Sequence, residues 1–580
     1  MESTVEQVMQ DILARRIGKE DALKLYGAFS EQDRNRLVQS LRSLADGPDA
    51  AGPAHNLKPV HEAHLDDAHR RYIADLSTRF SARTGKSKRN ASEHQQHFVD
   101  QRKVAGIKRP LKSIQYQLTY DRAEGAYLHD VDGNRYVDIT GDNGVNLFGH
   151  QPEFIKDALR KRLEQGYPLV AYSEELFEAA KLFCDLTGNE RMVYAQTGTE
   201  AVMWAVRIAR AATGKKKIVM FEGSYHGVSD TVFAMRGDHN QALSAGLGLL
   251  QEYADQIYML HYGDPSNLAF IEEHAGEIAC VLTEPVQSRF PERRPVEYVR
   301  ELRKITLERN IVLIFDEMVT GFRVGRRGAA GYYGVTPDIT TCGKVAGGGI
   351  PTGIIAGLAK YMDYVDGGVW DFDGNVMPSA RRAMMAGTHT QNSLKISATL
   401  AVCREMAKIC PPEGACEYGS CDCAIGLLNR RTKAMCEAVN ADFRARSLPI
   451  SLQTFSSWFR IVLHEDPYGL VRELLILLLR HNGVETSVSG NNFLNLAHTD
   501  EDTQAVVGAF RHATEELIQN GFFFVEPVEE KVTADIVSLH VPAVPQASAP
   551  RVKAKALLPV NTAALRELVM ADLRAVTRHS

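Results

Sequence analysis

Apolar, β-branched runs alternate with helical segments through the middle of the chain, and this alternation limits the possible folds more than any other feature. The runs are KIVMF (217–221), IACVLTEPV (278–286) and NIVLIFDE (310–317), separated by segments such as EYVRELRKITLERN. Strands and helices in alternation build a mostly parallel sheet with helices on both faces. Ligands of such sheets bind beyond the carboxyl ends of the strands. We therefore predict an α/β fold whose functional residues follow the strands.

The composition excludes several classes of protein. The 580 residues include 67 Lys and Arg against 72 Asp and Glu, so no broad positive field would attract nucleic acid. The sequence contains no run of about 18 apolar residues without charge, so we predict no transmembrane helix. The start, MESTVEQVMQDILARR, is acidic rather than typical of a targeting signal. We therefore expect a cytoplasmic protein that binds neither nucleic acid nor membrane, and the odd number of cysteines, nine, fits reduced thiols.

Two groups of potential metal ligands need their own interpretation. The stretch CPPEGACEYGSCDC (410–423) holds four cysteines without the paired spacing of a zinc site, so we predict a surface insertion with incidental thiols. His61, His64 and His69 lie on a predicted helix whose apolar face other residues form, and we expect these histidines to be solvated. The sequence therefore predicts no metal site.

The pattern changes towards both ends of the chain. We predict, in chain order, a helical N-terminal extension, a linker with a helix, the N-terminal part of a small α+β domain, a large domain, the rest of the small domain, and a Pro/Ala-rich tail with a terminal helix; the division into a small and a large domain is what the family resemblance given below implies. In order, these segments are 1–46, 47–100, 101–165, 166–390, 391–530 and 531–580. The extension fits either a docking element or a helical hairpin packed on the main body.

Two charged side chains follow predicted strands, at the carboxyl ends where the functional residues of such a sheet are expected. An apolar strand ends on Asp316, and a buried carboxylate needs a cationic or hydrogen-bonding partner, for which a helix cap or Arg323 would also suffice. In CGKVAGGGIP (342–351), Lys344 stands among glycines that let a flat ligand approach the backbone closely. Partial desolvation would lower the pKa of its amine towards that of a nucleophile. An exposed surface lysine is the alternative.

A phosphate site and an aromatic face complete the set. Thr197, Gly198 and Thr199 open a predicted helix whose free N–H groups could bind phosphate, although an ordinary Thr-capped helix would look the same. Tyr225 and His226 follow the run KIVMF, where a ring could lie against a planar cofactor or only pack in its loop. Pyridoxal phosphate (PLP) requires these groups together: a phosphate cradle, an aromatic face, an Asp for its pyridine nitrogen and a Lys for a Schiff base.

With these motifs the chain resembles the class III, or ω-, aminotransferases, on the fold type I scaffold of PLP-dependent transferases. The segments that carry the resemblance are TGTEAV (197–202), GSYHG (223–227), TEPV (283–286), IFDEMVTGFR (314–323), CGKVAGGGIP (342–351) and AGTHT (386–390). Around DEMVTGFR and GSYHG it is also similar to the glutamate-1-semialdehyde aminomutases. Over residues 65–525 it is most similar to the aminotransferase domains of polyketide and nonribosomal peptide synthases, with NNFLNLAHTDED (491–502) as one matching segment.

The resemblance implies a large domain with a mostly parallel sheet, a smaller α+β domain, and a role for each motif residue. Lys344 would hold the cofactor as a Schiff base and move a proton once substrate has freed it. Asp316 would keep the pyridine nitrogen protonated, and Glu284 would lie near the ring hydroxyl and the substrate amine.

The remaining motif residues would hold the cofactor in place. Gly198 and Thr199 would bind its phosphate, Tyr225 would stack on its ring and His226 would contribute to the same site. Thr388 would reach the phosphate from the partner subunit, so the resemblance implies a homodimer with shared active sites.

The resemblance leads us to expect an aminotransferase of specialised metabolite biosynthesis. It would move an amino group from an amino acid donor to a keto or aldehyde carbonyl of a polyketide or fatty-acyl intermediate, carried as a 3-oxoacyl thioester by an acyl or peptidyl carrier protein. A glutamate-1-semialdehyde-type 2,1-aminomutase and transfer to a free small aldehyde or ketone are the enzymatic alternatives. A cofactor-free scaffold that serves only as an interaction module is the non-enzymatic one.

Overall fold

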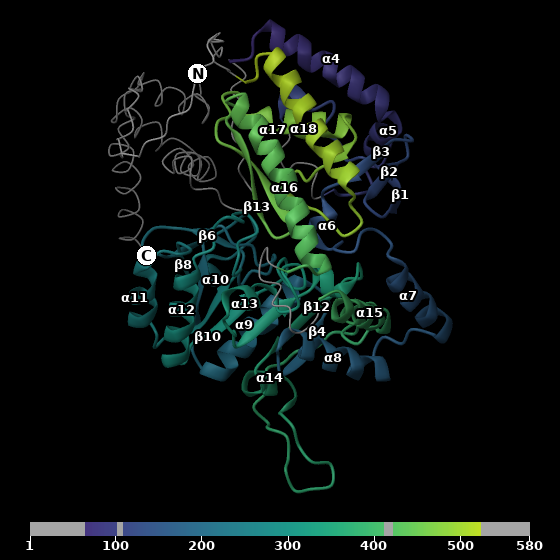
Figure 1. The fold of residues 1–580 in the computed structure, drawn as a ribbon. Helices are drawn as coiled ribbons and strands as arrows, with labels where there is room; N and C mark the ends of the chain where they lie inside the picture. The colour runs from purple at the N-terminus through teal and green to yellow at the C-terminus, as the bar shows by residue number, and fades with distance from the viewer. Residues whose placement is uncertain (1–63, 101–107, 411–420, 524–580) are drawn as a thin grey trace, which may run out of the picture. The chain divides into compact units, whose positions relative to one another are not determined.

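The computed structural model describes residues 64–100, 108–410 and 421–523, which all belong to one compact unit (Figure 1). The predicted N-terminal extension, the C-terminal tail and most of the cysteine-bearing insertion lie outside the described residues. Within the described ranges, no helix is long and apolar enough to cross a membrane.

A seven-stranded sheet forms the centre of the fold, in the order β4-β12-β11-β10-β9-β5-β8. Its strands are β4 (Arg191–Ala195), β5 (Lys217–Phe221), β8 (Ile257–Leu260), β9 (Ile278–Thr283), β10 (Val312–Asp316), β11 (Ile339–Cys342) and β12 (Gly353–Gly357). Neighbouring strands are parallel except at β12, which runs antiparallel to both β11 and β4. The predicted α/β class with a mostly parallel sheet is confirmed.

Helices cover both faces of this sheet, which explains why its central strands are apolar throughout. On β10, Val312 and Ile314 pack into one hydrophobic cluster with α9 (Gly198–Thr213), while Leu313 and Phe315 pack into another with α12 (Val296–Glu308). Side chains of a strand point to alternate faces, so both faces of β10 are buried and every one of its residues must tolerate burial. This alternation also places Asp316 and its neighbour Glu317 on opposite faces.

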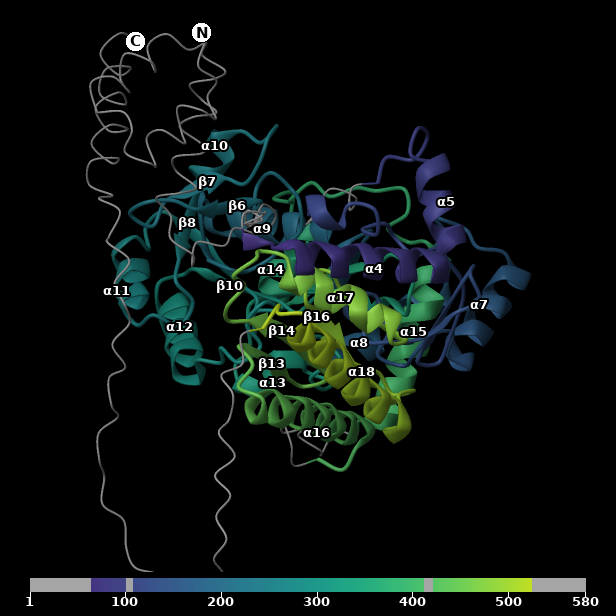
Figure 2. The same ribbon diagram turned by 90° about the horizontal axis from the view of Figure 1, so that it is seen from above.

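Two smaller sheets and several helices form the remaining part (Figures 1 and 2). The first sheet has the order β1-β2-β3-β15, with β1 (Tyr120–Glu124), β2 (Tyr127–Asp130), β3 (Arg135–Asp138) and β15 (Val484–Glu485). The second is β13-β14-β16, with β13 (Ile450–Phe455), β14 (Trp458–Leu463) and β16 (Asn491–Phe493). The helices beside them are α4 (Asp67–Arg83), α16 (Ala424–Ala445), α17 (Val471–His481) and α18 (Asp500–Gln519). Segments from both ends of the described chain therefore build this part.

The other elements connect these layers. They are α5 (Gly85–Glu93), the 3-10 helix η2 (Arg109–Leu111), α6 (Gly141–Gly144), α7 (Glu153–Gln165), α8 (Glu174–Thr187), β6 (Ala234–Arg236), β7 (Ala242–Ser244), α10 (Gln251–Ala254), α11 (Ser266–Glu273), α13 (Gly328–Tyr333), the 3-10 helix η3 (Lys344–Gly347), α14 (Ala359–Asp366) and α15 (Ser393–Ile409). Between α14 and α15 the chain makes a long excursion away from the sheet, seen below α14 in Figure 1.

One prediction about α4 is wrong. His69 is buried rather than solvated, because its ring packs against Tyr468 and Phe522, with centroids 4.8 and 4.7 Å away. Its Nδ1 lies 2.8 Å from Oδ1 of Asp66, the residue that caps the helix. His64 is exposed, and His61 lies outside the described residues. In the part of the chain that the structure describes, no group of three His, Cys, Asp or Glu side chains could hold a metal ion.

Candidate active site

The carboxyl ends of four neighbouring strands bring the candidate residues together. Strand β10 ends at Asp316, Glu284 follows β9, His226 lies in the loop after β5, and Lys344 opens the turn after β11. These strands are adjacent and parallel, so their carboxyl ends meet at one edge of the sheet. The structure thus gathers residues that are widely separated in sequence.

Asp316 is held by hydrogen bonds from three segments. It is 3% exposed, and its Oδ2 lies 2.7 Å from Nδ1 of His226. Its Oδ1 accepts hydrogen bonds from the backbone N–H of Met318 at 3.2 Å and from the hydroxyl of Thr341 at 3.1 Å. Thr341 is the residue paired with Asp316 in the β10–β11 register. The carboxylate therefore keeps a fixed orientation without any basic side chain from its own loop.

Arg323 does not pair with Asp316, so that alternative is wrong. Its guanidinium is buried and donates to the hydroxyl of Ser457 at 2.8 Å and to the carbonyl oxygens of Leu494 at 3.1 Å and Gly144 at 2.9 Å. Burial lowers the pKa of Arg323 to about 9. The arginine connects the loop after β10 to three distant segments instead of neutralising the carboxylate.

Lys344 lies in a tight turn and is partly buried. Its φ of 36° is in the left-handed region, which costs free energy for a residue with a side chain and is common at functional sites. Among the described residues, its Nζ forms no hydrogen bond or ion pair. Burial lowers the pKa of this amine, although the charges of Glu284 and Asp316 oppose the shift. The amine is therefore biased towards its neutral, nucleophilic form.

The beginning of α9 approaches the same edge of the sheet. Thr197 caps the helix by accepting the N–H of Glu200 at 3.2 Å, as the simple cap alternative requires. The first N–H groups of a helix have no acceptor inside it, so those of Gly198 and Thr199 remain available to an anion. A Cβ on Gly198 would lie 2.9 Å from Sδ of Met318, so any larger residue at this position would require the Met318 side chain to move.

Glu284 and Tyr225 lie beside this helix start. Glu284 is 4% exposed and accepts backbone N–H groups from Tyr225 at 3.0 Å and from Ser288 at 3.2 Å. Burial raises the pKa of its carboxyl, an effect that His226 opposes, so this group is disposed to carry a proton. Tyr225 is 46% exposed, which leaves its ring free to cover the face of a ligand.

Thr388 is exposed and makes no contact with the other candidate residues that the structure records. Its loop lies against the start of α9 of the same chain, because the Gln196 amide oxygen can accept the N–H groups of His389 and Thr390, both at 3.0 Å. The role expected of Thr388 across a dimer therefore stays a prediction.

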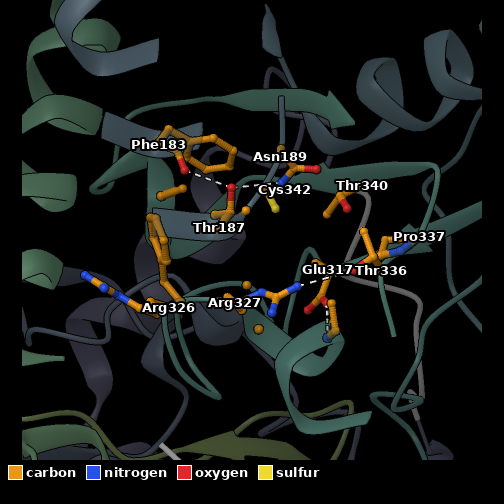
Figure 3. A pocket seen from close by; sticks show the side chains of 16 residues that line it. Phe183, Thr187, Asn189, Glu317, Arg326, Arg327, Thr336, Pro337, Thr340 and Cys342 are labelled. Atoms are coloured by element: carbon orange, nitrogen blue, oxygen red, sulfur yellow. Dashed lines mark hydrogen bonds between the residues drawn. The ribbon is translucent and has the colours of Figure 1, made fainter. Parts of the chain in front are cut away.

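A small cavity lies around Glu317 and Cys342, on the face of β10 opposite to Asp316 (Figure 3). Its volume is about 20 Å³, room for one or two water molecules but not for a cofactor. Glu317 accepts the N–H groups of Ala329 at 2.9 Å and Ala330 at 2.8 Å, at the start of α13. Burial raises its pKa to about 7. Glu317 therefore supports the loop that carries Asp316 from behind.

The gathered groups fit one kind of ligand. The start of α9 offers N–H groups to a phosphate, the half-exposed Tyr225 ring offers a flat face, and Asp316 offers a buried carboxylate to a ring nitrogen. Nε2 of His226 is buried without a hydrogen-bond partner among the described residues, as expected where a ligand completes the site. The partnerless amine of Lys344 suits an aldehyde. Together with the sheet topology, this arrangement defines a PLP-dependent enzyme of fold type I.

Comparison with known proteins gives the family. The profile of Aminotransferase class-III matches residues 110–411. A glutamate-1-semialdehyde 2,1-aminomutase of Methanocella arvoryzae is 31% identical over 441 residues, which cover 72% of this chain and 97% of that protein. The chain belongs to the class III aminotransferase family, and PLP is its cofactor.

Solved structures agree. The structure is similar to an omega-transaminase from Sphaerobacter thermophilus, with a TM-score of 0.64, 25% identity, and coverage of 74% of this chain and 97% of that one. It is also similar to a beta-phenylalanine aminotransferase from Variovorax paradoxus, with a TM-score of 0.64, 26% identity, and coverage of 77% and 98%. The predicted enzyme class is confirmed, and the cofactor-free scaffold is not supported.

Two contributions to the site have no signature in the sequence. Met318 packs against both Gly198 and Gly343, where an added Cβ would lie 2.9 and 2.8 Å from its sulfur. Thr341 holds Asp316 through the register of two strands. The register is the only signal that could have revealed Thr341, and it depends on pairing that the sequence does not display.

Proposed function

We propose that the chain catalyses amino-group migration of the 2,1-aminomutase type, in which the amine of an amino aldehyde moves to the neighbouring carbon. The observation that carries the proposal is the amine of Lys344. It has no hydrogen bond or ion pair within the described residues, and burial lowers its pKa against the opposing charges of Glu284 and Asp316. The similarity to glutamate-1-semialdehyde 2,1-aminomutases, at 31% identity over nearly their whole length, supports this type of reaction.

In this proposal each residue of the site has a separate task. PLP, when bound, would supply an electron sink that makes the proton on the amine-bearing carbon acidic. Lys344 takes that proton on Nζ and returns it at the neighbouring position, for which an amine of lowered pKa is suited. Glu284, with its raised pKa, holds a proton beside the reacting amine. Glu284 and Asp316 are both buried, at 4% and 3% exposed, so their charges act in surroundings of low polarity.

Asp316 and His226 hold the ring nitrogen. The carboxylate would face the cofactor while Nδ1 of His226, at 2.7 Å, fixes its orientation. Gly198 and Thr199 bind the phosphate through backbone N–H groups, and Tyr225 covers the ring. These assignments follow from where each group lies around the sheet edge.

Transamination onto an external carbonyl is the second candidate. The similarity to the omega-transaminase and the beta-phenylalanine aminotransferase favours it. Its most specific form, transfer from an amino acid to a carrier-bound 3-oxoacyl chain, rests on the resemblance to synthase-embedded domains and has no support from the comparisons. Transfer to a free keto acid or aldehyde uses the same residues.

Dependence on an external donor separates the two candidates. We expect PLP- or pyridoxamine-loaded protein to isomerise glutamate-1-semialdehyde in the absence of any other amino acid, as measured by product chromatography. The Lys344→Ala variant should lose this activity. Stoichiometric consumption of glutamate or alanine with a 3-oxo acid, or a carrier protein that gains an amine by intact-mass measurement, would instead establish transamination.

We also propose that the enzyme acts as a homodimer. The segment between α14 and α15 carries exposed apolar side chains, among them Val369 at 86%, Phe372 at 85% and Met377 at 81%, and it leads into the loop with Thr388. Apolar groups so exposed and so close together are typical of a protein interface. In such a dimer, Thr388 would reach the phosphate of the other subunit.

A further inference from the structure

Three arginines from different parts of the chain are near enough for the charges of two of them to act on the third, and one of them is also near Glu284 and Tyr225. Arg289 follows β9 and Glu284, Arg460 lies on β14, and Arg472 lies on α17. All three are partly buried. None of them belongs to the set that holds the cofactor.

Arg289 lies in a segment fastened to the loop of Tyr225. Next to it, the N–H of Ser288 binds Glu284, and Nε2 of Gln287 donates to the hydroxyl of Ser224 at 2.9 Å. On its other side, Phe290 packs so closely on Gly223 that an added Cβ would lie 2.4 Å from the ring. The side chain of Arg289 is thus held next to the stacking tyrosine and the buried glutamate, whose charges act on it.

Arg460 faces the same segment from the other side. Along β14, Phe459 and Ile461 point into the core of the smaller part, so Trp458 and Arg460 share the opposite face. Trp458 packs in the cluster that also contains Val286 of the segment after β9. At the end of the preceding strand, the guanidinium of Arg294 lies over the ring of Phe455 at 5.1 Å. The β13–β14 hairpin therefore docks on the segment that carries Arg289.

The charge of Arg460 is not compensated by the chain. Its Nη1 donates to Oδ1 of Asn491 at 2.8 Å, and within the described ranges it forms no ion pair. Apart from burial, the causes that lower its pKa, to about 10, are the charges of Arg472 and Arg289. Glu284 acts on Arg289, and Glu473 and Asp466 act on Arg472, whereas no carboxylate is among the causes that shift the pKa of Arg460. A buried cation in this position favours the binding of an anion. A planar guanidinium matches carboxylate and phosphate oxygens in a two-point contact.

We propose that Arg289 and Arg460 form an anion subsite that binds a carboxylate or phosphate of the substrate while its reacting carbon lies at Lys344. Arg472 donates to the carbonyl oxygen of Val488 at 2.7 Å, and its charge adds to the positive potential at Arg460. This subsite rests on the proposed function, because it names the substrate class of that same site. A carboxylate on a small amino aldehyde and the phosphate of a carrier arm share the required chemistry.

Anion titration of the PLP-loaded full chain tests the subsite without turnover. We expect titration calorimetry to detect binding of glutarate if the anion is a carboxylate, or of inorganic phosphate if it is a phosphate. Arg460→Gln and Arg289→Gln should weaken that binding about 10- to 100-fold, the usual effect of losing a hydrogen bond to a charged group. The exposed Arg122→Gln variant should leave it unchanged. Absence of binding to the wild type, or equal loss in Arg122→Gln, overturns the proposal.

Kinetics then separates the subsite from the reaction itself. With a substrate that carries the anion, Arg460→Gln should raise KM about 10- to 100-fold with kcat and the near-visible cofactor absorbance unchanged, and Arg460→Lys should recover part of the loss. With the methyl ester of the same substrate, the wild type and the variants should have similar KM values. Equal losses with acid and ester contradict the subsite. Failure of the wild type to turn over any substrate would contradict the proposed function. Anion titration would still show whether Arg289 and Arg460 bind an anion.

Discussion

The side chain of Asp316 depends on His226 more than on any residue of its own strand. The 2.7 Å contact with Nδ1 is the shortest hydrogen bond that the carboxylate makes, and both groups are buried. Hydrogen bonds to charged groups are about twice as strong as neutral ones, and burial strengthens them further. His226 therefore decides which way the carboxylate faces.

We expect Asp316→Asn to lower kcat by about 10²- to 10³-fold, the range found when a single electrostatic contact to a transition state is lost. His226→Phe should lower it less, by about 10- to 100-fold, because the carboxylate remains but is no longer held. Steady-state kinetics with cofactor content measured in parallel checks both. A His226→Phe variant as damaged as Asp316→Asn would mean that the contact of Nε2 with the ligand, rather than the orientation of Asp316, is the main role of His226.

The lowered pKa of Lys344 leads us to expect that the stability of the cofactor-free protein depends on pH. Its folded-state pKa is lowered from 10.5, mainly by burial and also by Arg323, against the opposing charges of Glu284 and Asp316. Between the lowered pKa and 10.5, the unfolded chain binds more protons than the folded one, so the free energy of unfolding rises with pH in this window.

Replacing the buried amine should therefore stabilise the cofactor-free protein at neutral pH. We expect Lys344→Met to raise its Tm by on the order of 1–2 °C near pH 7, with the difference shrinking towards pH 10.5. Calorimetric scans of both cofactor-free proteins across this range provide the measurement. A difference that grows with pH would show that the amine is stabilised, rather than penalised, by its surroundings.

The sequence predicted Lys344 and Asp316 because each stands out locally, one among glycines and the other at the end of an apolar run. The partners of these residues have no such signature. His226 reaches Asp316, and Arg460 approaches Arg289, only after the strands have taken their order in the sheets. Contacts of this kind depend on pairing between distant segments, which periodicity does not encode.

At the scale of the secondary-structure elements, hydrogen bonds from one arginine hold the loop after β10 against other segments. Arg323 donates three hydrogen bonds, to a hydroxyl and two carbonyl oxygens from segments that are otherwise far from β10 in sequence. It also lies over the ring of Phe493 at 5.0 Å. This side chain therefore joins the central sheet to the β13–β14–β16 sheet and to the α6 turn.

Truncating this side chain should loosen the junction. Arg323→Ala leaves buried carbonyl oxygens without donors, at about 1–3 kcal/mol each, so we expect a fall in Tm of several degrees and faster limited proteolysis. Calorimetry and timed proteolysis measure this, with the exposed Arg122→Ala as the control. An unchanged Tm would mean that water replaces the lost donors.

The central strands were predictable as elements, whereas their arrangement was not. Buried on both faces, β5, β9 and β10 read as continuous apolar runs and were located within a few residues. The reversed strand β12 carries no mark of its direction, because a residue pattern of period two is the same in parallel and antiparallel pairs. His69 was misassigned for a related reason: the residues that cover it, Tyr468 and Phe522, come from the far end of the described chain.

For the whole molecule, the proposed homodimer rests on the segment between α14 and α15, which Figure 1 shows extending away from the sheet. A charge on its exposed apolar side chains should oppose association, so Phe372→Asp combined with Met377→Asp is expected to shift the protein towards a monomer at micromolar concentration. Analytical ultracentrifugation measures the shift, and activity should fall with the dimer fraction because Thr388 would no longer reach the partner's phosphate. Leu247→Asp, at a residue that is 100% exposed, provides the matched control. A monomeric wild type with full activity would contradict both the dimer and the role of Thr388.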